Sequence, residues 1–176
     1  MNFRHSTTDK TEKLNNAQVL AFQWETINWA QVEQNVNRLQ SRTAKATAQG
    51  NKNRVKRLQY LLTHSFHAKA YAVKKATSNN GKNTSGVDKK LWSTPASKMK
   101  AVLTLTNKKY KAKPLRRVYI EKKNKGKKRP LRIPTMHDRA MQTLYALALE
   151  PVAETTGDSV SFGFCRGRSA KDACEQ

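Results

Sequence analysis

The sequence has few cysteines and no long apolar run, and each scarcity excludes a class of protein. Its two cysteines, Cys165 and Cys174, lack a second pair of ligands, which argues against a zinc site. No apolar run approaches the ~20 residues that a membrane span needs. The N-terminal residues are polar and lack the apolar core of a signal peptide. We therefore expect a soluble, cytoplasmic protein with free thiols and no membrane partner.

Acidic residues are also scarce, and this scarcity is concentrated in one part of the chain. The sequence has 12 Asp and Glu against 35 Lys and Arg, a formal net charge of +23. Residues 34–132 hold 28 basic and two acidic residues, hence +26, whereas 1–33 and 133–176 are nearly neutral. Such an imbalance concerns binding partners rather than fold. Nucleic acid is the first polyanion to consider, and an anionic membrane surface is the second.

The densest positive charge coincides with a predicted β-hairpin, RRVYIEKKNKGKKRPLRIPT at residues 116–135. Two apolar edges, Val118/Ile120 and Leu131/Ile133, flank a KKNKGKK tip that contains Gly and Asn. Nine of these twenty residues are Lys or Arg, so neighbouring charges repel one another. A polyanion would relieve that repulsion. The alternative is a solvated basic tip that only aids solubility.

Apolar periodicity predicts four helices around this hairpin. They are expected from the Asn28 cap to Gly50, over residues 55–73, over residues 91–107, and from a capping box at 135–138 onward. The first two are joined by a Gly-Asn turn and predict an antiparallel pair. The fourth is the least charged and the richest in Ala and Leu, so we expect it to be the core helix. Leu91, Met99, Val102 and Leu103 are the expected apolar side of the third helix.

The remaining segments lack a clear apolar period. Residues 1–22 predict a loose tail, and residues 77–88 predict a polar loop that contains glycine. Ser169 and Asp172 form another capping box, so a helix begins close to the end of the sequence. We interpret this as the cut edge of a longer fold.

Several motifs, in this order and spacing, match a known family. They are HSFHAKAYAVKK (64–75), GVD followed by LW (86–92), YKAKPLRRVYIEKKNKGKKRPLRIPTMHDRAMQ (110–142), LEPVAE (149–154) and SFGFCRGRSAKDA (161–173). Over roughly residues 24–176 the sequence resembles the N-terminal part of group II intron-encoded reverse transcriptase/maturases. The resemblance implies an α+β fold: a mostly helical N-terminal extension, then a basic β-hairpin and the core helix of a truncated polymerase fingers region. It also implies three segments: a flexible tail at 1–23, a helical reverse transcriptase N-terminal domain at 24–107, and the start of a truncated polymerase domain at 108–176.

The same resemblance implies roles for basic residues. Lys122 and Arg129 resemble the side chains that contact the incoming triphosphate, and Arg166 and Arg168 resemble template-backbone contacts. A planar Arg fork and a Lys point charge both suit phosphate oxygens. The helices and the 77–88 loop resemble the extension that grips intron RNA and template. The remaining expected RNA contacts are Arg54, Lys56, Arg57, Lys69, Lys74, Lys75, Lys82, Arg116, Arg117, Lys123, Lys125, Lys127 and Lys128.

Four residues depart from the family's usual pattern. Glu121 stands where proline is common, Arg132 where glycine is typical, and Cys165 where arginine is typical. Lys125 lengthens the hairpin tip by one residue. These changes concern nucleotide handling more than fold, and Arg132 matters most because a strand glycine often marks close backbone approach.

The sequence also has no Asp-Asp pair, whereas a polymerase needs paired carboxylates to hold divalent metal ions. We therefore expect no catalytic residue, metal site or cofactor in this chain, with Mg²⁺ entering only if a palm domain is supplied. Three functions remain open: an RNA-binding N-terminal fragment without independent catalysis, one half of a split RNA-directed DNA polymerase completed by a palm chain, or a non-functional gene remnant. The DNA downstream of the last codon would separate the last two.

Other candidate residues have simpler interpretations. Trp24, Trp29 and Trp92 could stack on bases, although core packing is favoured for the latter two. His64 and His67 are three residues apart on a helix, yet they lack nearby metal-ligating partners. Asp138 is expected to be a helix cap with no catalytic role. Tyr119 alternates with the apolar residues of its strand, so we expect it on the opposite face of the hairpin.

Overall fold

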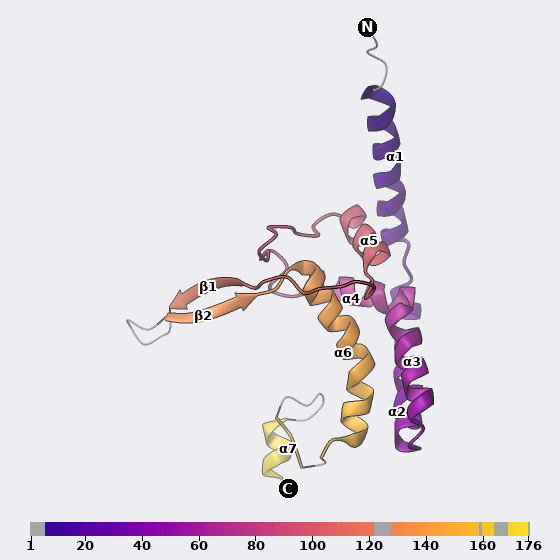
Figure 1. Cartoon of the computed structure of the whole chain (residues 1–176), viewed down its shortest axis with the longest axis vertical. Coiled ribbons are helices and arrows are strands. Elements are labelled where there is room, and N and C mark those ends of the chain that lie inside the picture. Colours follow the sequence, from indigo (N-terminus) through magenta and orange to yellow (C-terminus); the bar gives the residue numbers. More distant parts are fainter. Residues whose placement is uncertain (1–5, 122–127, 159, 164–168, 176) are drawn as a thin grey trace.

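The computed structural model describes residues 6–121, 128–158, 160–163 and 169–175. In these ranges the elements are α1 (Ser6–Glu25), α2 (Trp29–Ala48), α3 (Lys52–His64), α4 (Phe66–Ser78), α5 (Pro95–Thr104), β1 (Arg116–Glu121), β2 (Lys128–Ile133), α6 (Met136–Thr156) and α7 (Ala170–Cys174). The strands form one antiparallel hairpin that extends from a helical body (Figure 1). The expected α+β class is confirmed.

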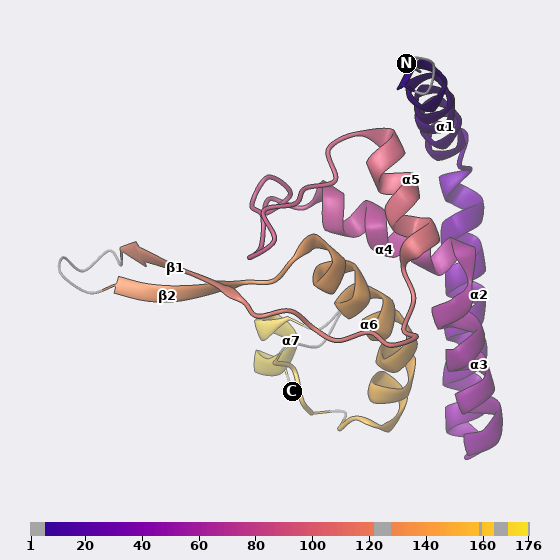
Figure 2. The ribbon, with the colours of Figure 1, turned by 45° about the horizontal axis from the view of Figure 1, so that its top comes forward.

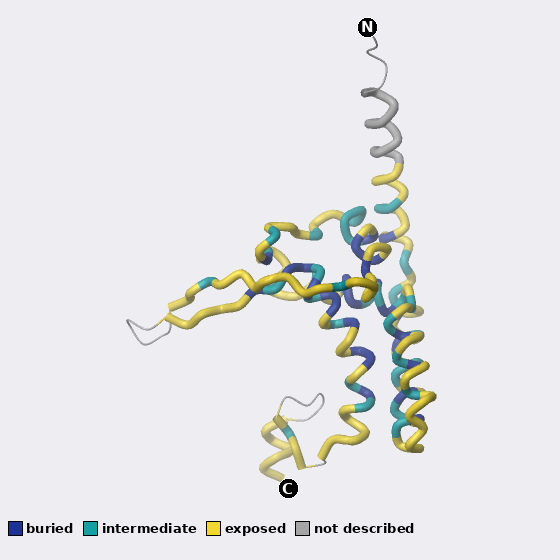
Figure 3. The backbone as a smooth tube through the Cα atoms, viewed as in Figure 1, coloured by how far each residue is buried: buried dark blue, intermediate teal, exposed yellow. Residues whose placement is uncertain are grey.

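The core is built around α6, as its Ala- and Leu-rich sequence predicts. Met141, Leu144 and Leu147 are buried on the side of α6 that packs against α2, α3 and α4. Burying each such side chain contributes about 1.5–3 kcal/mol. Figure 3 shows the buried positions gathered where these helices meet, while the hairpin is exposed along most of its length.

A proline inside α6 is accommodated by a side chain from α2. Pro151 has no N–H, so it cannot donate to the carbonyl of Leu147 four residues earlier. Gln40 donates its side-chain amide to that carbonyl at 2.9 Å. From α3, Gln59 donates to the neighbouring carbonyl of Ala148 at 3.1 Å. The two glutamines therefore tie α2 and α3 to the backbone of the core helix.

The predicted antiparallel pair corresponds to α2 and α3. Asn28 caps α2 by accepting a hydrogen bond from the backbone N–H of Gln31 at 3.1 Å. Gly50 lies in the short connection between the helices with a φ of +67°, a conformation that glycine adopts without steric cost. Val36 of α2 and Leu62 of α3 belong to the buried core cluster.

The prediction of one continuous helix over residues 55–73 is wrong. Ser65 is extended, with φ −67° and ψ 135°, and it separates α3 from α4. Its hydroxyl accepts a hydrogen bond from the backbone N–H of Ala68 at 3.2 Å, so it caps the second helix. Apolar residues occur on both sides of this break, and Leu62 of α3 and Val73 of α4 belong to the same core cluster.

The third predicted helix is shorter than expected. Helix α5 begins after Thr94, which forms a capping box with Ser97, and Pro95 occupies the first helical turn. Met99 and Val102 are buried as predicted, whereas Leu103 is 59% exposed and points away from the core.

Residues 1–23 are not the expected loose tail throughout, because α1 is helical from Ser6 onward. Near its C-terminal end, Leu20 and Trp24 pack against the core, and Trp24 meets Trp29 edge-on with ring centroids 5.0 Å apart. Both tryptophans thus take part in packing. Apolar contact confined to the end of a helix leaves no long apolar stripe in the sequence, which explains the missed helix.

Candidate nucleic-acid interface

The β1–β2 hairpin extends away from the helices (Figures 1 and 2). Its register places Val118 opposite Leu131, so the two predicted apolar edges do share one face. Ile133 at the root is buried and Val118 is half-buried, while every other strand residue is exposed. An isolated two-stranded hairpin is marginally stable at best in water. A partner that covers it would therefore stabilise it.

The opposite side of the hairpin, which we call the arginine face, is polar. It consists of Arg117, Tyr119, Glu121, Lys128, Pro130 and Arg132. Arg117 and Arg132 are direct cross-strand partners, and both are exposed. Like charges in such positions destabilise a hairpin. A phosphate between the two guanidinium groups would remove the repulsion and accept charge-assisted hydrogen bonds.

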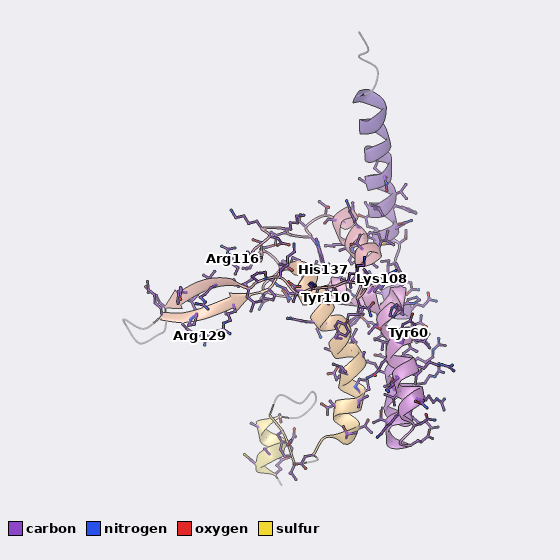
Figure 4. The ribbon with its side chains drawn as sticks, viewed as in Figure 1. Tyr60, Lys108, Tyr110, Arg116, Arg129 and His137 are labelled. Atoms are coloured by element: carbon purple, nitrogen blue, oxygen red, sulfur yellow. The ribbon has the colours of Figure 1, made fainter. Side chains whose placement is uncertain are left out.

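The other predicted contacts on the hairpin are divided by this register. Lys128 lies on the arginine face, opposite Glu121, whereas Arg129 lies opposite Ile120 on the apolar face (Figure 4). Tyr119 is 58% exposed beside the arginine pair, as its alternation predicts. Some predicted contacts lie outside the described residues: Lys122, Lys123, Lys125, Lys127, Arg166 and Arg168.

The loop before α5 is held beside the root of the hairpin. Arg116 of β1 donates to the carbonyl of Ser85 at 3.3 Å. Arg139 of α6 donates to the carbonyls of Gly81 at 2.8 Å and Thr84 at 2.5 Å. The predicted RNA contact Lys82 lies exposed within this loop. Sequence reasoning missed Arg139, because its partners are more than fifty residues away along the chain.

Close backbone packing fixes the end of the same loop. A Cβ atom on Gly86 would lie 2.6 Å from the Cα atom of Thr135 and 2.7 Å from its backbone nitrogen. Such contacts are closer than carbon and nitrogen tolerate, so only glycine fits here. The loop is thus packed on the first residues of α6.

The basic residues of the helices form a region of their own. Arg54, Lys56 and Arg57 are exposed on α3, and both views place α3 on the far side of α6 from the hairpin (Figures 1 and 2). The basic residues of α3 therefore lie in a helical region that is separate from the hairpin and its neighbouring loop.

The basic residues of α4 differ in their surroundings. Lys75 is exposed and Lys69 is half-buried. Lys74 has partners within the protein: its Nζ atom lies 3.6 Å from a Glu33 carboxylate oxygen and 4.4 Å from the centroid of the Trp29 ring. Lys74 thus contributes to the fold, a role that the sequence analysis did not predict.

A buried carboxylate fixes the start of α6. The carboxylate of Asp138 accepts hydrogen bonds from the hydroxyls of Tyr110 at 2.5 Å and Thr135 at 2.6 Å, and its backbone N–H donates to the Thr135 hydroxyl. Burial alone would raise the pKa of Asp138, but these hydrogen bonds lower it below its usual value. Burial and the bond to Asp138 raise the pKa of Tyr110 to about 12. Thr135 is therefore the N-cap of α6, and Asp138 is a charged residue of the first turn that holds the hydroxyl of this cap in place.

The helical part of the chain, from Trp24 to α5, is similar to a known protein family. Residues 24–105 match the family model for the N-terminal domain of reverse transcriptase. The chain contains a reverse transcriptase N-terminal domain. The matched segment runs from Trp24 through α2, α3, α4 and the loop before α5 to the end of α5.

Two curated relatives extend the match beyond the reverse transcriptase N-terminal domain. The group II intron-encoded protein LtrA of Lactococcus lactis subsp. cremoris is 36% identical over 117 residues, which is 65% of this chain and 19% of LtrA. Protein YkfC of Escherichia coli (strain K12) is 32% identical over 143 residues, 78% of this chain and 37% of YkfC. The chain thus spans between about a fifth and two fifths of the length of these relatives.

No group of three or more His, Cys, Asp and Glu side chains among the described residues could hold a metal ion. His64 instead stacks on Tyr60, with centroids 3.9 Å apart, and His67 lies 3.4 Å from the amide nitrogen of Asn35. None of the described helices is long and apolar enough to cross a membrane.

Proposed function

We propose that this chain binds RNA, either intron RNA or template, as the N-terminal part of a group II intron reverse transcriptase/maturase. The binding surface is the hairpin together with the loop at 79–86, and the cations of α3 and α4 supply a second contact region. The reverse transcriptase N-terminal domain and the relation to LtrA support an RNA partner.

One observation carries this proposal: an exposed hairpin presents cations that no carboxylate in the described structure neutralises. The ion pairs between described residues are Lys74–Glu33, Lys113–Asp88 and Lys171–Glu175, and none of them involves β1 or β2. Apart from Ile133 and the half-buried Val118, the strand residues are exposed. Glu121, opposite Lys128, is the one acidic residue of the two strands against five Lys and Arg. A ribose-phosphate strand would supply both contact area and counter-charge.

The phosphate contribution makes a quantitative test possible. If the chain neutralises ~6–10 phosphates, its RNA affinity falls ~10³–10⁵-fold between 50 and 200 mM salt. Phosphate contacts carry no sequence information, so variants at Arg117 and Arg129 are expected to weaken all RNAs about equally.

The experiment compares RNA binding of the wild-type chain and an Arg117→Gln/Arg129→Gln variant across a salt series. The matched control is Lys171→Gln, which removes an exposed cation on α7, outside the basic segment. We expect the double variant to bind more weakly and with a shallower salt dependence, and the control to behave as wild type. Equal behaviour of all three proteins would contradict the proposal.

A second candidate function, completion of the chain by a separate palm-containing polymerase chain, has narrower support. The main apolar side of α6 is buried against α2, α3 and α4, so it is not available to such a partner. The exposed Tyr145 and Leu149, four residues apart on another side of α6, remain available. Primer extension with Mg²⁺ after co-expression with related palm chains tests this candidate. Loss of extension in Leu149→Asp supports it, and persistent inactivity with every palm chain contradicts it.

A further inference from the structure

A lysine-lined cleft lies between α5 and the first turn of α6, apart from the hairpin. It has a volume of about 560 Å³, within the range of small-molecule sites. Its walls come from four parts of the chain: the residues after Gly86, helix α5, the segment before β1, and the start of α6. We call it the lysine cleft. The residues that carry the argument are Lys90, Lys100, Lys109, Lys111, Trp92 and Tyr110.

The charge of the lysine cleft is positive and uncompensated. Five lysines line it against two acidic residues, Asp88 and Asp138, which leaves +3. The Asp138 carboxylate already accepts two hydroxyl groups, and Asp88 lies 4.0 Å from Lys113. No carboxylate among the described residues pairs with the other four lysines. The lysine cleft is therefore suited to an anion.

The walls also offer aromatic rings. Trp92 and Tyr110 are half-buried, pack against the core on one side, and line the lysine cleft. The ring centroid of Tyr110 lies 5.6 Å from that of His137, another lining residue (Figure 4). Rings anchored by the core and surrounded by ammonium groups match a nucleotide, whose base stacks on aromatic faces and whose phosphate attracts lysine.

The backbone around the lysine cleft is unusual as well. The described non-glycine residues with positive φ are Lys89 and Lys109, at +54° and +58°. Lys109 lines the cleft, and Lys89 lies between two residues that line it. The left-handed region costs a non-glycine residue about 1–2 kcal/mol, and such strain is typical of binding sites. Both strained positions lie at the same cleft.

We propose that the lysine cleft binds one nucleotide unit of a single-stranded RNA. The base lies against Trp92 and Tyr110, and the flanking phosphates contact Lys100, Lys109 and Lys111. This inference rests on the proposed RNA binding but concerns a separate site. It predicts that single-stranded RNA gains an interaction that a duplex, whose bases are stacked and paired, does not make.

The test uses the full chain and a 12-nucleotide oligo(U) that carries one 4-thiouridine, with a 12-base-pair RNA duplex as the second ligand. We expect cross-links to Trp92 or Tyr110 from the single strand. Lys100→Gln/Lys111→Gln, which changes two exposed side chains, is expected to lower the salt slope for oligo(U) by ~1.4, since each phosphate contributes ~0.7. Trp92→Leu is expected to weaken oligo(U) binding about 5- to 160-fold, the range for one stacked base.

The controls separate this site from the hairpin. Lys171→Gln is expected to bind as wild type, and Arg117→Gln is expected to weaken binding of the duplex as well as the single strand. RNA binding with cross-links confined to the hairpin, and an unchanged slope in Lys100→Gln/Lys111→Gln, would overturn the cleft and leave the proposed function standing. Labelling of the cleft by 8-azido-ATP without any oligo(U) cross-link would also overturn it, because the ligand would then be a free nucleotide. Absence of all RNA binding would overturn both proposals.

Discussion

The substitution Arg132→Thr is expected to stabilise the hairpin and to weaken RNA binding, two effects of opposite sign. Arg132 lies directly across from Arg117. Two charges ~7 Å apart in water repel by about 0.6 kcal/mol, which screening at 0.15 M salt reduces to about 0.2–0.3 kcal/mol. Threonine removes this repulsion and is favoured in strands. Protection of the β1 and β2 amides from hydrogen exchange should rise about 1.5-fold.

The effect on binding is larger. Each phosphate contact to single-stranded RNA contributes a salt exponent of ~0.7, which corresponds to about fivefold in affinity at 0.1 M salt. Loss of the Arg132 contact should therefore raise the dissociation constant about fivefold, measured by fluorescence anisotropy with labelled RNA. A Lys171→Thr variant is the matched control, since it removes the same charge from α7, outside the two strands. Unchanged RNA affinity, or hairpin protection that falls, would refute the proposed phosphate contact between the two arginines.

Three further predictions concern the packing that positions the interface. Gly86→Ala should destabilise the chain by about 1–3 kcal/mol in urea unfolding, because the new methyl group meets backbone atoms of Pro134 and Thr135, just before α6. Gly163→Ala, whose added Cβ has no described atom within 4 Å, should be near neutral. Gln40→Leu should lower the free energy of unfolding by about 1–3 kcal/mol, because the Leu147 carbonyl loses its donor. Adding Pro151→Ala to this variant should recover much of that loss, since alanine restores an N–H donor to α6. Additive effects of the two substitutions would contradict the role assigned to Gln40. The raised pKa of Tyr110 means that the folded state binds the phenol proton more tightly than the unfolded state does. The resulting contribution to the free energy of unfolding is present below pH 10 and is lost between pH 10 and about 12. Tyr110→Phe should abolish that loss.

Local features of the fold were predictable from the sequence, and tertiary ones were not. The hairpin follows from alternation on either side of a Gly- and Asn-containing tip, and the core helix follows from its composition. The break at Ser65 was missed although a serine cap stood in the sequence, because apolar residues occur on both sides of it and both helices contribute to the same core. Leu103 was wrongly placed in the core for a related reason: a short helix buries a narrower side than its apolar residues suggest.

The candidate site depends more strongly on long-range contacts. The arginine face could have been derived from strand pairing, but it required the register. Arg139 and the lysine cleft had no local signal, because their parts come from segments far apart in the sequence. The division of the basic residues into two regions likewise results from the placement of α3 and the hairpin on different sides of α6.

The central claim is that uncompensated cations on this reverse transcriptase N-terminal domain and its hairpin hold a ribose-phosphate strand. The most direct measurement is the dependence of RNA affinity on salt for the full chain. Six to ten phosphate contacts predict a slope of about −4 to −7 in log K against log salt concentration for single-stranded RNA. A slope near zero would contradict the account.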